Sequence, residues 1–264
     1  MDPEQPDQGN LSEWRSMLLG TNRFSRFGRS LLGVLPRSPR CELCASPFKG
    51  PFAPALGLLG KRPFAKNPRY CGTCIGGLVK HKGGADVPIT SLFADVRGST
   101  PLGERLGPKG MHDLIDRFYA SGVDVLIAGG AIVDRFMGDQ VVGYFVPGFA
   151  GAEHPRRAIE SGLALLRATG NIGQAEPWVP IGVGIHSGTA YVGTVGRADT
   201  ILELTAQGED VVVAARLAAL AAAGEALVSE TAYAAAGLDL PSERRELQLK
   251  GVSATVAVRA LRSV

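Results

Sequence analysis

Runs of apolar residues alternate with polar and Gly-rich segments along the last two thirds of the chain. Short continuous apolar runs predict buried strands, and apolar residues spaced three or four apart predict helices. Hairpins and crossover helices are mixed, so we expect an α+β sheet with helices on one face. The pattern predicts strands at 89–96, 131–137, 140–146, 179–186, 190–195, 200–206 and 226–228, helices at 108–128, 152–169, 209–222 and 229–235, and a final hairpin near 243–260.

The first 87 residues lack this regular pattern. Residues 11–35 carry apolar side chains three to four apart among arginines, which predicts one or two amphipathic helices after a short polar tail. A basic amphipathic helix can rest on an anionic membrane, but packing on the partner protomer or on the rest of the chain is the preferred interpretation. The predicted organisation is a tail and helical segment at 1–40, a four-cysteine module at 41–74, a Gly-rich linker at 75–87 and a larger domain at 88–264.

Charge and composition support this division. The chain has 264 residues, room for one large domain or two modest ones. Residues 1–87 carry 13 Lys and Arg against 6 Asp and Glu, a net of +7, and residues 88–264 carry 15 against 19, a net of −4. The longest clean apolar run, Val125 to Val133, has nine residues, less than half of the ~20 that span a bilayer. With an acidic, polar N-terminus and no secretory signal, we expect a cytoplasmic protein.

All four cysteines lie in the basic part, as two C-x2-C pairs separated by 26 residues. Two residues between thiolates let both sulfurs of a pair reach one ion, and two pairs complete a tetrahedral site. A structural zinc is the preferred occupant, with an iron–sulfur cluster or free thiols as alternatives. A closed site of this kind is not catalytic, and the sparse interleaving of aromatic and basic residues argues against nucleic-acid binding. The predicted ligands are Cys41, Cys44, Cys71 and Cys74.

Two acidic residues follow apolar segments in the larger domain. Asp95 ends the predicted strand at 89–96, and Asp139 lies at the turn of the next predicted hairpin, after Gly138. If these strands are neighbours, both carboxylates converge at one edge of the sheet. Carboxylates beside Gly-rich backbone suit hard divalent ions that also hold phosphates. Taken as isolated residues, the two aspartates are better interpreted as ordinary turn residues.

Four strings in this domain, taken together, closely resemble the class III nucleotidyl cyclase catalytic domain in order and spacing. The resemblance covers about residues 86–262, and the paired-cysteine module also resembles that of some bacterial members. It implies a ferredoxin-like α+β core at 88–264 that forms a head-to-tail homodimer with active sites at the interface. The strings are Phe93–Thr100, Arg135–Asp139, Gly182–Gly188 and Gly208–Leu217.

The resemblance also implies residue roles. Asp95 and Asp139, with the Val96 carbonyl, match the ligands of two Mg2+ or Mn2+ ions. Arg216 matches an arginine that binds the phosphates in the transition state, and Lys250 matches a lysine for the terminal phosphate; both act on the partner's site. The expected phosphate cradle is Gly98, Ser99 and Thr100.

Two departures from the family pattern bear on the activity. Arg135 stands where a purine-selecting lysine is expected, and its expected partner is Thr205, a pair that resembles the adenine-selecting pair of many bacterial members. Val212 replaces an asparagine that orients the ribose, and valine cannot hydrogen-bond. Such a loss commonly costs about 10²-fold or more in rate.

Three functional hypotheses follow. The first is an adenylate cyclase that makes cyclic AMP from ATP. The second is a degenerate cyclase-like domain that binds nucleotide or a partner without turnover. The third is a guanylate or dual-substrate cyclase. In each case we expect the cysteine module and the amphipathic segment to set the geometry of the dimer.

Overall fold

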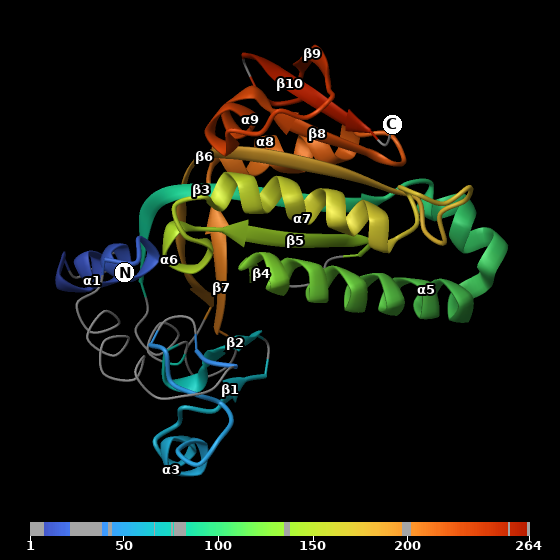
Figure 1. Ribbon diagram of the computed structural model, residues 1–264. Helices are drawn as coiled ribbons and strands as arrows, with labels where there is room; N and C mark the ends of the chain where they lie inside the picture. Colours follow the sequence, from blue (N-terminus) through green and yellow to red (C-terminus); the bar gives the residue numbers. More distant parts are fainter. Residues whose placement is uncertain are drawn as a thin grey trace, which may run out of the picture. The chain divides into compact units, whose positions relative to one another are not determined.

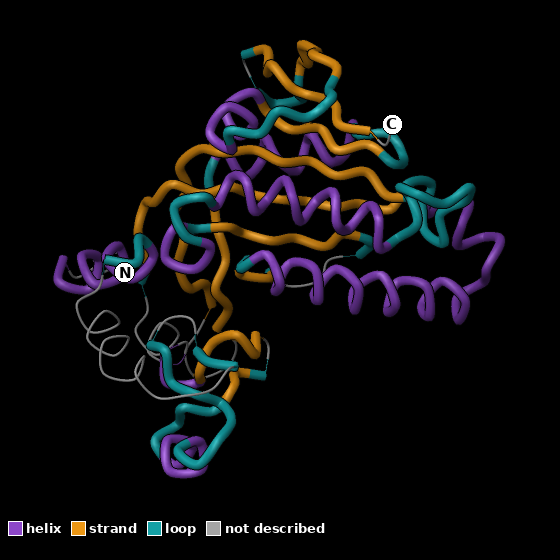
Figure 2. Tube along the Cα trace, viewed as in Figure 1, coloured by secondary structure: helices purple, strands orange, loops and turns teal. Residues whose placement is uncertain are grey.

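The chain divides into two units, each built from segments that are separate in the sequence. A computed structural model of the protein describes residues 8–21, 39–41, 44–65, 67–74, 76, 83–134, 138–196, 202–252 and 254–262. Two segments that follow Pro88 in the sequence belong to the same unit as the cysteines. The elements can be followed in Figure 1 and the loops between them in Figure 2. Unit 1 consists of Met1–Val87, Val146–Gly151 and Ala190–Gln207, and unit 2 of Pro88–Phe145, Ala152–Thr189 and Gly208–Val264.

A mixed sheet forms the centre of unit 2, which confirms the expected α+β fold. Its strand order is β4-β5-β3-β6-β8-β10-β9. β6 and β8 are parallel, and β5 pairs antiparallel with β3 and β4, as β10 does with β8 and β9. The strands are β3 (Gly84–Val96), β4 (Ile132–Val133), β5 (Gln140–Phe145), β6 (Ile181–Gly196), β8 (Glu225–Ser229), β9 (Glu243–Gln248) and β10 (Thr255–Arg262). The helices are α5 (Ser99–Gly129), α7 (His154–Ala168), α8 (Glu209–Leu220) and α9 (Glu230–Ala236).

Helices cover both faces of this sheet, so the prediction that they share one face is wrong. A Cβ on Gly162 of α7 would lie 2.9 Å from the Ile185 side chain. A Cβ on Gly184 would lie 2.1 Å from the Ala218 amide nitrogen of α8. Neighbouring residues of a strand point to opposite faces, so α7 and α8 pack on opposite sides of β6. The reason is that Gly182 and Gly184 leave one face of β6 without side chains, which admits the backbone of α8.

Helix α5 begins earlier than the predicted helix at 108–128. Gly98 precedes it in the left-handed region (φ 64°) and turns the chain from β3 into the helix. A kink at Gly107 (φ 68°, ψ 171°) divides the helix before Pro108. Because proline fits the first turn of a helix, the second segment begins where the sequence predicts it.

Strand β6 replaces two predicted strands, at 179–186 and 190–195. The chain does not break at Gly188, where a Cβ would lie 2.1 Å from the Asp210 carboxylate. Beyond Thr189, β6 continues in unit 1 and pairs antiparallel with β7 (Leu202–Gln207). The remaining predictions match the structure in kind: the first hairpin is β4–β5, and the strand at 226–228, the helix at 229–235 and the last hairpin are β8, α9 and β9–β10.

Short elements make up the described part of unit 1. Trp14 and Leu18 of its first helix are buried within the chain. The rest of the predicted amphipathic segment, residues 22–38, lies outside the described residues, as does most of the predicted linker. No helix within the described ranges has the length and apolar character needed to cross a bilayer. Besides β7 and the end of β6, this unit contains α1 (Gln8–Leu18), α3 (Ala53–Leu58), the antiparallel pair β1 (Pro63–Phe64) and β2 (Asn67–Cys71), and α6 (Pro147–Ala150).

Candidate functional site

Two neighbouring strands bring the predicted aspartates together. Asp95 lies opposite Gln140 in the β3–β5 pairing, and Asp139 directly precedes Gln140. The Val96 amide donates a hydrogen bond to the Asp139 carbonyl at 3.2 Å. The strands are therefore neighbours, as convergence of the two carboxylates requires.

Arg97 contacts the carboxylate of Asp95, one of the two aspartates. Burial raises the pKa of Asp95, Arg97 opposes the increase, and the charge of Asp139 adds to it. Arg97 contacts the Asp95 carboxylate through Nη2 and donates to the Asp95 carbonyl from Nε at 3.2 Å. Its Nη1 donates to the Ala219 carbonyl of α8 at 2.8 Å. Two half-buried carboxylates that repel each other form a set of oxygen donors that a divalent cation can neutralise.

Tyr119 supports the turn that carries Asp139. Its hydroxyl donates to the Gly138 carbonyl. Burial raises the pKa of Tyr119, and the charge of Asp139 raises it further. Sequence reasoning missed both Arg97 and Tyr119. Arg97 lies in the Asp-Val-Arg-Gly string and had a signal, whereas Tyr119 is one of many polar residues on a long helix.

The predicted phosphate cradle is the N-terminus of α5. Gly98 caps the helix, and Ser99 and Thr100 are its first residues. The first amides of a helix have no partner within the helix and attract anions. Only two residues separate Gly98 from Asp95, so the first backbone amides of α5 lie close to Asp95 in the sequence.

Helix α8 presents Arg216 on an exposed face. Val212 lies one turn before it and Leu220 one turn after it, and these residues are 45% and 52% exposed. The turn at Lys250 packs against the opposite side of the same helix. The buried cluster that joins them includes Val213, Leu217 and Ala221 of α8 and Leu249 and Val252 of the turn.

The predicted purine-binding pair is described only in part. Thr205 is buried on β7, opposite Gly193 of β6 in unit 1. Arg135 lies outside the described residues, so the pairing of Arg135 with Thr205 stays a prediction.

A histidine of the third string ties α8 to β6. His186 Nε2 lies 2.9 Å from Asp210 Oδ1, and the Thr189 amide donates to Asp210 Oδ2 at 2.7 Å. Asp210 lies in the first turn of α8, two residues after Gly208, which precedes the helix. This supports a structural role for His186, because its contact fixes the start of the helix that carries Arg216.

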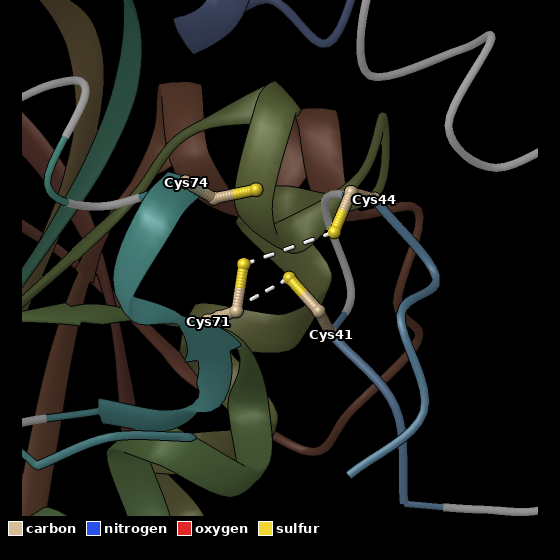
Figure 3. Close-up of side chains that lie close together, drawn as sticks. All are labelled: Cys41, Cys44, Cys71 and Cys74. Atoms are coloured by element: carbon tan, nitrogen blue, oxygen red, sulfur yellow. Dashed lines mark hydrogen bonds between the residues drawn. The ribbon is translucent and has the colours of Figure 1, made fainter. Parts of the chain in front are cut away.

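The four cysteines converge in unit 1, as their spacing predicts (Figure 3). Their Sγ atoms all lie within 4.8 Å of one another, and those of Cys44 and Cys71 are 3.8 Å apart. Hydrogen bonding with Cys41 lowers the pKa of Cys44 below that of an ordinary thiol and lowers the pKa of Cys71 to about 7. Such a cluster can hold a metal ion.

Comparisons with known proteins agree with this geometry. The family model of the adenylate and guanylate cyclase catalytic domain matches residues 84–258. The adenylate cyclase of Anabaena cylindrica is 30% identical over 138 residues, which cover 50% of this chain and 27% of that protein. The chain spans about a quarter of the length of the curated relatives it matches.

Solved structures show the same mixed α+β fold. The guanylyl cyclase Cya2 is 28% identical with a TM-score of 0.60, and the match covers 69% of this chain and 95% of that one. The adenylyl cyclase CyaB from P. aeruginosa is also 28% identical with a TM-score of 0.59, and the match covers 69% and 97%. Two solved structures of nearly equal similarity to this chain are thus named as cyclases of different nucleotides, one guanylyl and one adenylyl.

Proposed function

The chain belongs to the adenylate and guanylate cyclase catalytic domain family, and on that premise we propose that it converts ATP to 3′,5′-cyclic AMP and pyrophosphate as a homodimer. The observation that carries the proposal is that Asp95 and Asp139 lie at neighbouring strand ends: Asp95 pairs with Gln140 across β3 and β5, and the Val96 amide donates to the Asp139 carbonyl. Attack of the ribose 3′-hydroxyl on the α-phosphorus, with pyrophosphate leaving in line, needs positioning and charge neutralisation more than covalent chemistry.

The aspartate pair fits the divalent ions that this family implies. Asp95, Asp139 and the Val96 carbonyl would hold two Mg2+ or Mn2+ ions, which prefer oxygen ligands. The fit rests on the donor set: two adjacent carboxylates, with burial and mutual repulsion both raising the pKa of Asp95. When bound, such ions favour deprotonation of the 3′-hydroxyl and neutralise the triphosphate. The protein's part is to hold the carboxylates in place, through the backbone bond from Val96 and through Arg97.

The α5 N-terminus supplies donors for the triphosphate. Ser99 and Thr100 begin a long helix, and Gly98 leaves its first amides unobstructed by a side chain. Amides at this position bind phosphate oxygens through hydrogen bonds and through the positive end of the helix dipole.

The remaining phosphate contacts come from a second copy of the chain. Arg216 would engage phosphate oxygens as charge develops, and Lys250 would bind the terminal phosphate. Both are exposed in the single chain. The exposed apolar residues Val212 and Leu220, on either side of Arg216, support an interface on this face of α8.

ATP is the preferred substrate. Arg135 and Thr205 resemble an adenine-selecting pair, and two of the relatives at 30% identity are named adenylate cyclases. The similarity to the guanylyl cyclase Cya2 keeps guanylate or dual-substrate activity as the alternative. A second alternative is a domain that binds nucleotide without turnover, which Val212 favours because it cannot hydrogen-bond to the ribose.

The test is a nucleotide turnover assay on the purified full chain, with ATP and GTP side by side and with Mg2+ or Mn2+. We expect cyclic AMP from ATP, lost in Asp95→Asn but kept in Asp113→Asn. Asp113 is the matched control because its side chain is 57% exposed on α5 and forms an ion pair with the nearby Lys109. Absence of cyclic nucleotide over a wide range of protein concentration would contradict the proposal, and cyclic GMP as the main product would establish the guanylate alternative.

A further inference from the structure

The cysteine cluster has the dimensions of a site for a single ion. Four sulfurs about 2.3 Å from a tetrahedral ion are about 3.8 Å from one another. The observed Cys44–Cys71 distance is 3.8 Å, and no pair exceeds 4.8 Å. An iron–sulfur cluster places several irons and sulfides between its cysteines, so it needs wider spacing. The geometry therefore favours one metal ion with four thiolates.

Groups around the cluster compensate its negative charge. The Cys71 amide donates to Cys41 Sγ at 3.2 Å, and Lys61 Nζ lies 3.7 Å from Cys44 Sγ. Burial alone would lower the pKa of Lys61, but attraction to the thiolates of Cys44, Cys71 and Cys74 raises it overall. Hydrogen bonds and cations of this kind stabilise thiolate ligands.

The first cysteine pair lies in a constrained loop. Ala45, directly after Cys44, has a φ of 58°, and it is the one described non-glycine residue with a positive φ. The Ala45 amide donates to the Cys41 carbonyl at 2.7 Å, and the Cys41 amide donates to the Ser46 carbonyl at 2.8 Å. A positive φ is unfavourable for alanine because of its Cβ, so the surrounding contacts must offset this cost. A loop held in shape by metal ligands would provide such contacts.

A line of contacts within unit 1 leads away from the cluster. Tyr70, next to Cys71, is fully buried, and its ring meets that of Phe149 edge to face with centroids 4.9 Å apart. Phe149 lies in α6, the segment between β5 and α7 in the sequence. A Cβ on Gly148 would lie 2.3 Å from the Met17 carbonyl at the end of α1, so the two helices touch through their backbones.

We propose that the four cysteines hold one Zn2+ ion, and that this ion, by fixing Cys71 at the end of β2, keeps Tyr70 against Phe149 and thereby docks α1 on α6. Zinc suits the site because four thiolates in a closed tetrahedron match its preferences and leave no position for substrate. The ion thus joins the N-terminal segment to a loop inside the region that matches the cyclase family. The proposal goes beyond cyclase activity, and its test does not depend on turnover.

Trp14 provides a local reporter of the docking. It is buried in α1, and the other tryptophan, Trp178, can be removed as Trp178→Phe. In this background we expect one zinc per full-length chain by elemental analysis and no visible absorbance. Chelation should shift the Trp14 emission to longer wavelength, and added Zn2+ should reverse the shift. Emission that is the same with and without metal would overturn the docking, and an iron chromophore or reduced thiols that bind no metal would overturn the zinc site.

Two variants separate the metal from the contacts that follow it. Cys44→Ser should lose zinc and expose Trp14, although Cys44 lies 26 positions before Tyr70 in the sequence. Phe149→Leu should keep a full complement of zinc but break the link between the zinc site and α1. Chelation should then no longer shift the Trp14 emission. The control is Phe52→Ala, which removes an aromatic ring of unit 1 that is 48% exposed and should change neither readout. A Cys44→Ser protein with zinc lost and unchanged Trp14 emission, or a Phe149→Leu protein with an undiminished shift, would contradict the docking.

Discussion

The cysteine cluster and the aspartate pair are the two proposed sets of metal ligands; the first would be complete within the chain and the second would not. The cluster gathers four soft cysteine sulfurs within 4.8 Å of one another. The pair supplies two hard carboxylates, with Arg97 as the counter-charge at Asp95. A closed set stabilises a fold, because nothing else can reach the ion. An open set can bind phosphates through its metals, and in the proposed mechanism the nucleotide and a second protomer complete it.

The largest expected effect separates the two sites by mutation. Asp139→Asn should lower cyclase turnover by about 10³-fold or more, since it removes a metal ligand worth several kcal/mol of transition-state stabilisation. It should leave the zinc content and the Trp14 emission unchanged. Elemental analysis, fluorescence and the turnover assay on one preparation test both statements. Retained turnover would remove Asp139 from the proposed site, and loss of zinc would show that the two sites are not independent.

The sequence identified the candidate residues of both sites but not the residues that support them. Cys-x2-Cys pairs and the strings around Asp95 and Asp139 are local patterns. Local patterns can be recognised in a sequence without knowledge of the fold. The contacts of Tyr119 with Gly138 and of Arg97 with Ala219 join residues 19 and 122 positions apart. Nothing in a single sequence states which distant residues meet, so these supports could only be found in three dimensions.

The errors in the predicted fold have the same origin. The predicted strand at 179–186 correctly includes Gly182 and Gly184, but the sequence does not show that these glycines leave one face of the strand open for α8. The sequence predicts a break between two strands near Gly188. In the structure the strand continues through Gly188, and the Asp210 carboxylate occupies the space that a side chain would need there. Glycine marks both a turn and a close approach, and only the neighbouring element distinguishes the two.

The next expected effect concerns the incomplete site. Val212→Asn should raise kcat by about 10²-fold, because an orienting hydrogen bond to the ribose acts mainly in the transition state. The residue is exposed on α8, so the substitution should not disturb the core. Leu220→Asn, two turns further on the same face, is the matched control and should give no increase. An unchanged kcat in Val212→Asn would show that position 212 does not limit the reaction.

Acid should weaken metal binding at the open site. Burial, with the charge of Asp139 added, raises the pKa of Asp95 against the influence of Arg97. In the metal-free protein, at a pH between the ordinary carboxyl pKa and the raised one, Asp95 therefore holds a proton in the folded state that it has lost in the unfolded state. The resulting stabilisation is fully present below the ordinary carboxyl pKa and is lost as the pH rises through the raised one.

A metal ion must displace this proton, so the Mn2+ affinity should fall by up to about tenfold for each pH unit below the raised pKa. Titration of free Mn2+ by electron paramagnetic resonance, without nucleotide, measures this directly. In Asp95→Asn the affinity should be weak at every pH. An affinity of the unchanged protein that does not vary across the acid range would contradict the role of Asp95 as a ligand.

The smallest expected effect tests the support beneath Asp139. Tyr119→Phe removes the hydroxyl that donates to the Gly138 carbonyl, and loss of such an outer contact typically costs about 10- to 100-fold in metal affinity or activity. We expect the lower end, about tenfold, because the backbone bond from Val96 to Asp139 still holds the turn. The loss should appear in the Mn2+ affinity, with zinc content and Trp14 emission unchanged. Tyr191→Phe, which removes a hydroxyl from an exposed tyrosine of β6, is the matched control; if both variants bind Mn2+ equally well, Tyr119 does not position the open site.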